Sequence, residues 1–167
     1  MNLPTRPDNA RVISEVKATG SGAFLCMETD RGTVRITGRD TLDLLNRLTT
    51  MKVDELAYGQ VQETLLTNEK GRVIDAALVV PRDEDVLLLL SPDRTGEVLS
   101  WLEKYTIMED CVYENISASV GQCSLYQITG DMRLGSAAVP DAGCSAVVVM
   151  GETTVRLLHH RSVKGEG

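Results

Sequence analysis

The sequence predicts an α+β fold in which antiparallel sheets carry helices on one face. Two observations lead to this prediction. Short segments that alternate apolar and polar residues are interrupted by two stretches with apolar residues at helical spacing, and most connections are short turns. The 167 residues, 43% of them hydrophobic and 25% charged, suit one globular domain. We expect a polar N-terminal segment over residues 1–14, a single domain over 15–160 and a flexible tail over 161–167.

The first elements are a predicted hairpin and a helix. Ala23 to Glu28 is predicted as a strand, Asp30-Arg31-Gly32 as a turn, and Thr33 to Thr37 as the pairing strand. In the following GRDTLDLLNRLTT, leucines recur at helical spacing, and Gly38 or Asp40 can cap the helix. The apolar stripe of this helix consists of Leu42, Leu44, Leu45 and Leu48. We expect the stripe to face the core.

Three strands in succession are predicted next. They cover Val61 to Thr67, Val73 to Val80 and Val86 to Leu90. The turns at Asn68 to Gly71 and at Pro81 to Asp85 join them, and a Tyr58-Gly59 turn precedes them. Short connections favour an antiparallel meander, because parallel neighbours need a long crossover.

A second helix is predicted to begin at Ser91-Pro92-Asp93, with serine as the cap and proline at the first helical position. Its buried stripe is Val98, Leu99, Leu102 and Tyr105, with Trp101 at the edge of the stripe. Later strands are predicted over Cys111 to Ile116, Ser124 to Thr129, and a closing hairpin of Ala146 to Met150 with Thr153 to Leu158.

Composition argues against several classes of function. Acidic residues number 24 against 17 basic ones, and a net charge of −7 argues against nucleic acid as a partner. No apolar run approaches the ~20 residues of a membrane span, and the N-terminus lacks the apolar core of a signal peptide. We therefore expect a cytoplasmic protein with no membrane partner.

The cysteines and histidines do not suggest a metal site. The cysteines form no C-x-x-C pair, and we expect them to serve mainly in packing. They are Cys26, Cys111, Cys123 and Cys144. His159 and His160 are adjacent but have no matching cluster of further ligands, so no metal is predicted.

Asp75 is the residue that most needs an explanation. It lies within the apolar strand VIDAALVV, where alternation puts it on the face of Val73, Ala77 and Val79, with Ile74 on the other face. An unpaired buried carboxylate costs several kcal/mol, so a partner is expected. Two interpretations stay open: Asp75 lies at an edge or pairs with Arg72 or Arg82, or it faces a ligand.

Common catalytic and nucleotide motifs, such as G-x-G-x-x-G, H-E-x-x-H and G-x-S-x-G, do not occur. Four linked segments nevertheless carry a resemblance: TVRITGRDTLDLLNRLTT, LAYGQVQETLLTNEKGRVIDAALVV, DVLLLLSPDR and SWLEKYTIMED. Over about residues 34–130 they resemble the N-terminal half of the family that comprises the glycine-cleavage T-protein and YgfZ-type folate-binding proteins. The resemblance implies a ring of domains around a tetrahydrofolate pocket, with a ferredoxin-like portion supplied from Gly59 onward.

The resemblance also implies a site. In T-proteins the aspartate at the place of Asp75 faces the folate, so Asp75 is the expected catalytic residue, and tetrahydrofolate or a 5-substituted derivative is the expected cofactor. The adjacent loop supplies the other expected cofactor-binding residues, although a structural turn or a solvated charge explains the same residue types. They are Thr67, Asn68, Lys70, Gly71 and Arg72. T-proteins often carry a second acid next, where this chain has Ala76.

Three functions follow from these observations. The first is a YgfZ-like tetrahydrofolate-binding protein linked to one-carbon transfer or to assembly or repair of iron-sulfur proteins. The second is an aminomethyltransferase of the glycine-cleavage type, and the third is a non-catalytic interaction module without a folate pocket. The K-G-C-Y-x-G-Q-type motif of the YgfZ second half does not occur here. We expect a homodimer or a second protein to complete the pocket.

Overall fold

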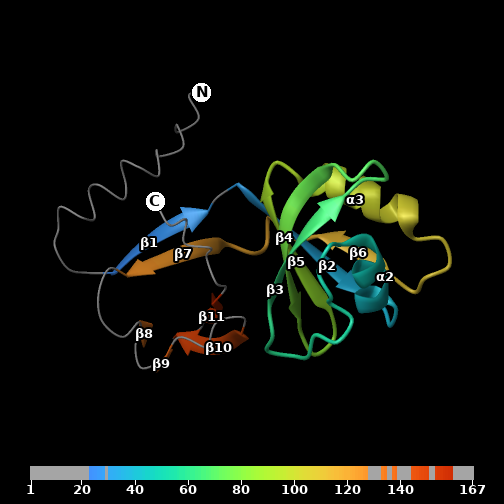
Figure 1. Cartoon of the computed structure of the whole chain (residues 1–167). Coiled ribbons are helices and arrows are strands. Elements are labelled where there is room, and N and C mark those ends of the chain that lie inside the picture. Colours follow the sequence, from blue (N-terminus) through green and yellow to red (C-terminus); the bar gives the residue numbers. More distant parts are fainter. Residues whose placement is uncertain are drawn as a thin grey trace.

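The largest sheet of the described part is antiparallel, with five strands in the order β3-β4-β5-β2-β6, and lies on the right in Figure 1. The structure is a computed structural model that describes residues 23–28, 30–127, 133–134, 137–138, 144–150 and 153–159. The five strands are β2 (Arg31–Thr37), β3 (Gln62–Thr67), β4 (Val73–Pro81), β5 (Val86–Pro92) and β6 (Val112–Asn115). The predicted meander of three strands is therefore confirmed as β3-β4-β5.

Two helices and three two-stranded ribbons complete the described part of the chain. The helices are α2 (Thr41–Leu48) and α3 (Thr95–Tyr105). The ribbons pair β1 (Ala23–Glu28) with β7 (Gln122–Gln127), β8 (Arg133–Leu134) with β9 (Ala137–Ala138), and β10 (Cys144–Met150) with β11 (Thr153–His159). The closing hairpin is confirmed as β10-β11.

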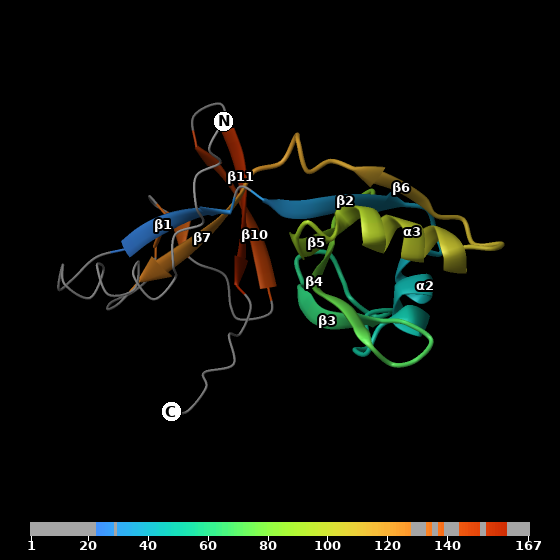
Figure 2. The same cartoon turned by 90° about the horizontal axis from the view of Figure 1, so that it is seen from above.

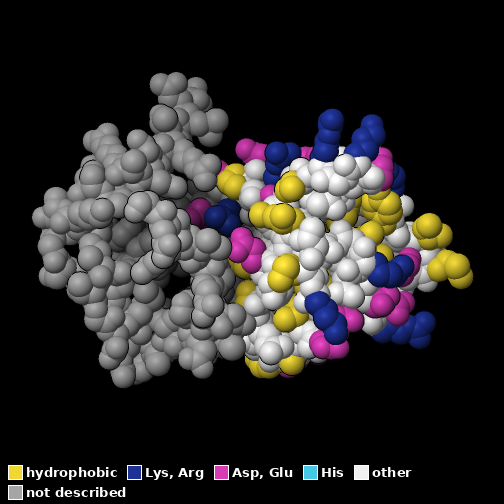
Figure 3. Space-filling model, viewed as in Figure 1, with side chains coloured by type: hydrophobic (Ala, Val, Ile, Leu, Met, Phe, Trp, Pro, Cys, Tyr) yellow, Lys and Arg dark blue, Asp and Glu magenta, His cyan; other side chains and the backbone are white. Residues whose placement is uncertain are grey.

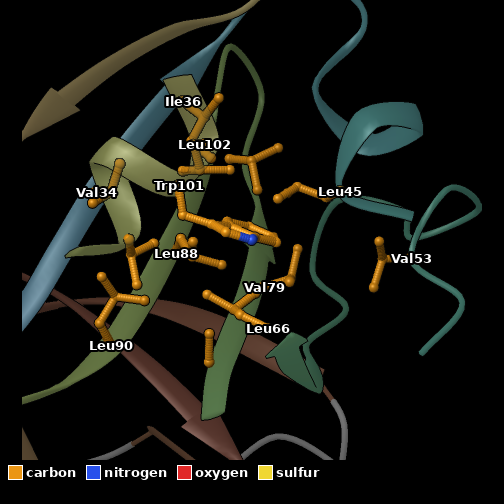
Figure 4. Close-up of a cluster of buried hydrophobic side chains, with 13 residues drawn as sticks. Val34, Ile36, Leu45, Val53, Leu66, Val79, Leu88, Leu90, Trp101 and Leu102 are labelled. Carbon is orange, nitrogen blue, oxygen red and sulfur yellow. The ribbon is translucent and has the colours of Figure 1, made fainter. Parts of the chain in front are cut away.

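Both helices pack on the same face of the sheet, as the predicted fold class requires. Leu45 of α2 and Val98 and Leu102 of α3 join one buried cluster with alternate residues of β2, β4 and β5 (Figure 4). Burying each such side chain stabilises the fold by about 1.5–3 kcal/mol. Trp101 is 7% exposed and lies inside this cluster, so the prediction that it lies at the edge of the stripe is wrong.

The opposite face of the sheet carries a second, smaller apolar cluster. Val61, Val80, Leu87 and Leu89 form it, with Leu78 and Ile116 packed against them. Neighbouring residues of β5 thus belong to different clusters, as the period of two in a strand requires. β5 is apolar along most of its length because both of its faces are covered.

The predicted pairing of the first two strands is wrong. β1 pairs with β7, whereas β2 pairs with β5 on one side and β6 on the other. Figure 2 shows β1 and β2 following one another along one line instead of folding back. Val34 and Ile36 of β2 are almost completely buried, and a central strand of this kind needs hydrogen-bonding partners at both edges.

The predicted start of the second helix is also wrong. Ser91 and Pro92 continue β5, Asp93 adopts a left-handed φ of 61°, and α3 begins at Thr95 with Arg94 as the N-cap. The backbone N–H of Ser91 donates to the carboxylate of Asp75, which keeps Ser91 extended. A tertiary hydrogen bond therefore overrides the local helix-start pattern.

The first helix begins close to the predicted place. Asp40 occupies the N-cap position of α2 but makes no side-chain capping bond; its carboxylate instead accepts from the N–H of Asp110 at 2.8 Å. Thr41 is buried, and its hydroxyl donates to the carbonyl of Gly38 at 2.8 Å. The beginning of α2 is thus tied to the segment that precedes β6.

The loop between α3 and β6 is organised by Glu109. Its carboxylate accepts from the N–H groups of Ile107 and Met108 at 2.9 and 3.1 Å and from the guanidinium of Arg47 at 2.8 Å. These contacts, with Arg47 the largest cause, lower the pKa of Glu109 to about 2. Ile107 and Met108 are 85% and 93% exposed, and Figure 3 shows hydrophobic side chains at this edge of the described surface.

Acid should weaken this loop. Because the pKa of Glu109 is lowered, its stabilising contribution is complete above the ordinary value of 4.5 and is lost as the pH falls toward 2. We expect Glu109→Gln to remove that part of the acid dependence, measured as the free energy of unfolding in urea between pH 2 and 6. Equal acid dependence in both proteins would contradict the assignment.

Some predictions concern residues outside the described part. They are the segments 1–14 and 161–167, Thr129 and His160, and the side chains of Cys26, Cys123, Cys144 and His159. Cys111 is described: its thiol is half-buried, burial raises its pKa, and it packs against the helix-side cluster. In the part of the chain described, no helix is long and apolar enough to span a membrane.

Candidate functional site

Asp75 lies in β4, with β3 on one side and β5 on the other. Its side chain is 5% exposed and points toward the helix side of the sheet, like Ala77 and Val79. The position is interior, so the interpretation that places Asp75 at a sheet edge does not describe this structure. The predicted alternation holds from Asp75 onward.

A β-bulge precedes Asp75. Leu66 pairs with Asp75, but the next residue of β3, Thr67, pairs with Val73, so Ile74 is the extra residue. Ile74 consequently packs against the helix-side cluster, and its predicted placement on the opposite face is wrong. Bulges bend a strand and redirect its side chains, and they often occur beside functional sites.

Backbone amides hold both carboxylate oxygens of Asp75. Oδ1 accepts from the N–H of Ala76 at 2.9 Å, and Oδ2 accepts from the N–H of Ser91 at 3.0 Å. The β4-β5 ladder pairs Leu78 with Leu89 as its last registered pair on this side. Continuing that register places Ala76 opposite Ser91. The carboxylate therefore provides the acceptor for both amides where the two strands separate.

The arginines predicted as possible partners lie elsewhere. Arg82 forms an ion pair with Asp85 in the turn after β4. Arg72 is exposed, and its backbone N–H donates to the side chain of Asn68. Within the described residues, Asp75 has backbone hydrogen bonds and no ion pair. The partner that its burial requires is thus supplied by the protein's own amides.

The predicted loop residues form a tightly hydrogen-bonded turn. Oδ1 of Asn68 accepts from the N–H groups of Lys70 and Arg72 at 2.9 and 3.0 Å. Asn68 and Arg72 also form a backbone bond, and Gly71, with φ of 71°, donates to the carbonyl of Asn68. Asn68 and Gly71 therefore have structural roles, because a left-handed φ favours glycine and asparagine favours such turns.

The remaining predicted residues lie on different sides of the sheet. Thr67 is half-buried and pairs with Val73, and cross-strand partners share a face, so this pair faces away from the helices. Lys70 and Arg72 are exposed, and neither has an ion pair within the described residues. The structure thus brings the turn and β4 together but leaves the carboxylate of Asp75 on the helix side.

Sequence reasoning missed two side-chain contacts in this region. Ser91 donates to Asp75, and Glu69 at the tip of the turn contacts Lys104 and Tyr105 at the end of α3. The distances to Glu69 are 3.5 Å from Lys104 Nζ and 3.1 Å from the Tyr105 hydroxyl. Tyr105 belongs to the predicted buried stripe, but no local pattern shows which loop its hydroxyl reaches.

One buried polar atom is without a partner in the described residues. The indole N–H of Trp101 has no hydrogen-bond acceptor, although the ring lies among Leu45, Val79 and Leu66 (Figure 4). Leaving a buried donor unpaired costs about 1–3 kcal/mol. Trp101 also meets Tyr105 edge to face, with ring centres 5.7 Å apart.

The hollows in the surface lie away from the predicted site residues, and the described residues contain no group of metal ligands. Two open hollows of about 290 and 270 Å³ lie near Arg31 and Ser117, away from the turn that follows β3. The predicted site residues do not line either one. Among the described residues, no cluster of three or more histidine, cysteine, aspartate or glutamate side chains could hold a metal ion.

Comparisons with known proteins agree with this fold. The family model described as the GCVT N-terminal domain matches residues 4–128. Aminomethyltransferases from Halalkalibacterium halodurans and Bacillus mycoides are each 30% identical over 124 residues, 74% of this chain and 33% of theirs. The crystal structure of glycine cleavage system aminomethyltransferase T from Bartonella henselae superposes with a TM-score of 0.57 at 18% identity, covering 64% of this chain and 30% of that one.

Proposed function

This chain belongs to the GCVT N-terminal domain family, the N-terminal part of the T-protein folate-binding family, and we propose that it contributes to a tetrahydrofolate site for aminomethyl transfer. The observation that carries the proposal is the match over residues 4–128, which includes the turn after β3 and all of β4. The chain spans about a third of the length of the curated relatives named above. A second copy or another polypeptide completes the proposed site.

The proposed site lies at the end of β3 and β4 where the turn joins them. The proposed ligand meets Asp75 on the helix side of the sheet, and its anionic end lies near Lys70 and Arg72, which are exposed on the turn. Lys70 and Arg72 remain proposed contacts. Thr67, whose side chain faces away from the helices, remains one through its backbone.

Asp75 has a specific place in this proposal. Two backbone amides already use one lone pair on each carboxylate oxygen, and a carboxylate has about four acceptor positions in all. The remaining positions can accept from a folate N–H or stabilise a cationic intermediate. Asp75 thus holds the ends of β4 and β5 in place and offers negative charge to the ligand.

Calorimetric titration with tetrahydrofolate and 5-formyltetrahydrofolate tests the proposal. We expect saturable binding by the unmodified chain and at least a tenfold loss of affinity in Asp75→Asn, because the substitution removes the negative charge. Asp43→Asn is the matched control, since Asp43 lies on the outer surface of α2 with its side chain 69% exposed. Its affinity should equal that of the unmodified chain.

Each outcome distinguishes among the candidate functions. No binding by the folded chain contradicts a folate site on this chain alone and favours the interaction module. Binding that survives Asp75→Asn limits Asp75 to a structural role. The relatives named above are aminomethyltransferases, which favours one-carbon transfer over assembly or repair of iron-sulfur proteins.

A further inference from the structure

The turn between β3 and β4 is internally rigid but joins the rest of the molecule at few points. Its backbone bonds and the Asn68 side chain close it on itself. Within the described part of the chain, Glu69 is the residue of the turn whose side chain reaches another element. The position of the whole turn over the sheet therefore depends strongly on what Glu69 contacts.

Glu69 contacts the last turn of α3. Its Oε2 atom accepts from the Tyr105 hydroxyl at 3.1 Å and lies 3.5 Å from Lys104 Nζ. Lys104 Nζ in turn lies 5.0 Å from the centre of the Tyr105 ring. The Glu69 carboxylate thus contacts a hydroxyl and an ammonium group that come from neighbouring residues of the helix.

Tyr105 connects this contact to the core. Its ring meets Trp101 edge to face, and Trp101 belongs to the buried cluster together with Leu66 of β3. The turn is therefore tied at two places: covalently through β3 and β4, and through Glu69 to a helix anchored in the same core. Two anchors restrict the turn to one position over the sheet.

We propose that Glu69 is a positioning residue, which with Tyr105 holds the Asn68–Arg72 turn in the orientation that the ligand site on β4 requires. The inference rests on the proposed folate function for its effect on affinity. Its structural part, that the contact with Tyr105 sets the mobility of the turn, stands independently. Both acting side chains lie outside the set of site residues predicted from the sequence.

The expected effects are moderate because the contact is exposed. The Glu69 side chain is 61% exposed and that of Lys104 58%, and exposed ion pairs contribute little. The hydrogen bond from Tyr105 is the stronger contribution. Loss of one such bond corresponds to a change of about threefold to tenfold in the equilibrium that it controls.

Amide hydrogen exchange of the folded, ligand-free chain measures the turn directly. The N–H groups of Asn68, Lys70, Gly71 and Arg72 are all hydrogen-bonded within the turn, so their exchange reports its opening. We expect Tyr105→Phe and Glu69→Ala to accelerate this exchange about threefold to tenfold. Glu69→Gln keeps an acceptor for the Tyr105 hydroxyl and should stay closer to the unmodified chain.

The same variants then receive 5-formyltetrahydrofolate in calorimetric titrations. Tyr105→Phe and Glu69→Ala should bind about threefold to tenfold more weakly, with Glu69→Gln in between. Glu97→Ala is the control on the same helix, because Glu97 is 53% exposed and pairs with Arg94. It should change neither exchange in the turn nor affinity. Trp101, the single tryptophan, supplies an emission signal next to Tyr105 for the same titration.

The two measurements separate the two proposals. If the unmodified chain binds no folate, the proposed function fails, and faster exchange in Tyr105→Phe and Glu69→Ala still supports the positioning role. Exchange in the turn that is unchanged in both variants overturns the positioning role, whatever the affinity. Unchanged affinity in variants with a loosened turn shows that the ligand does not depend on it, which also overturns the proposal.

Discussion

Replacing Asp75 by alanine should lower the free energy of unfolding by about 2 to 3 kcal/mol. The substitution removes the acceptor for the N–H groups of Ala76 and Ser91 at the point where β4 and β5 separate. An amide left without an acceptor in a buried position costs about 1–3 kcal/mol, and the exposed position of Ala76 lets water replace part of the loss. Urea denaturation, followed by circular dichroism, measures the change.

Two further variants show whether the loss belongs to the carboxylate. Asp75→Asn retains one acceptor oxygen and should lose about 1 kcal/mol less than Asp75→Ala. Asp43→Ala removes an exposed carboxylate that pairs with Arg47 on α2, and its effect should stay within about 0.5 kcal/mol. A loss in Asp75→Ala no greater than in Asp43→Ala would mean that the two amides do not depend on Asp75.

Stability and folate affinity together define what Asp75 does. If the Asp75 carboxylate has only a structural role, its replacement lowers the stability of the ligand-free chain. Folate affinity then changes only as a consequence. If the carboxylate also meets the ligand, Asp75→Asn loses affinity even at temperatures where the variant is fully folded. Measuring both quantities on the same preparation therefore separates the two roles.

Gly38→Ala should be at least as damaging, with a loss of about 3 to 5 kcal/mol. Gly38 adopts φ of 120°, a conformation that side chains disfavour, and a Cβ atom there would lie 1.9 Å from the carbonyl oxygen of Asp110. The obstacle is backbone, which cannot rotate away like a side chain. Strained backbone and overpacking each cost about 1–3 kcal/mol. Thermal and urea denaturation measure the loss.

Two other glycines provide matched controls for Gly38→Ala. Gly71 has φ of 71°, but a Cβ atom there would meet no atom within 4 Å, so Gly71→Ala should cost about 1 kcal/mol from the backbone alone. Gly96 lies in α3 with the same open space, and Gly96→Ala should stabilise by about 0.5–1 kcal/mol. Equal effects of Gly38→Ala and Gly71→Ala would contradict the predicted collision with Asp110.

Strand and helix positions were largely predictable because burial has a local signature. Alternating residues identify β3, β4 and β5, and the leucine stripe identifies α2 within a few residues. The same alternation correctly places Asp75 on the face of Ala77 and Val79. The alternation fails at Ile74, because the bulge adds one residue to β4. The residues before the bulge therefore lie on the opposite face from the one that alternation predicts.

The candidate site was less predictable than the fold. The segment from Thr67 to Asp75 stands out for its composition, and the structure shows that Asn68 and Gly71 build a turn there. The acceptor role of Asp75 toward Ser91 and the contact of Glu69 with Tyr105 join residues 16 and 36 positions apart. No periodicity within a short window carries that information.

The sequence by itself determined the fold class, most element positions, the apolar faces and the resemblance to a family that the comparisons then showed. Only the tertiary structure decided that β1 pairs with β7, that β5 extends through Pro92, and that backbone amides satisfy Asp75. The physical reason is that periodicity reflects whether a side chain is buried, whereas pairing depends on which distant segment supplies the partner.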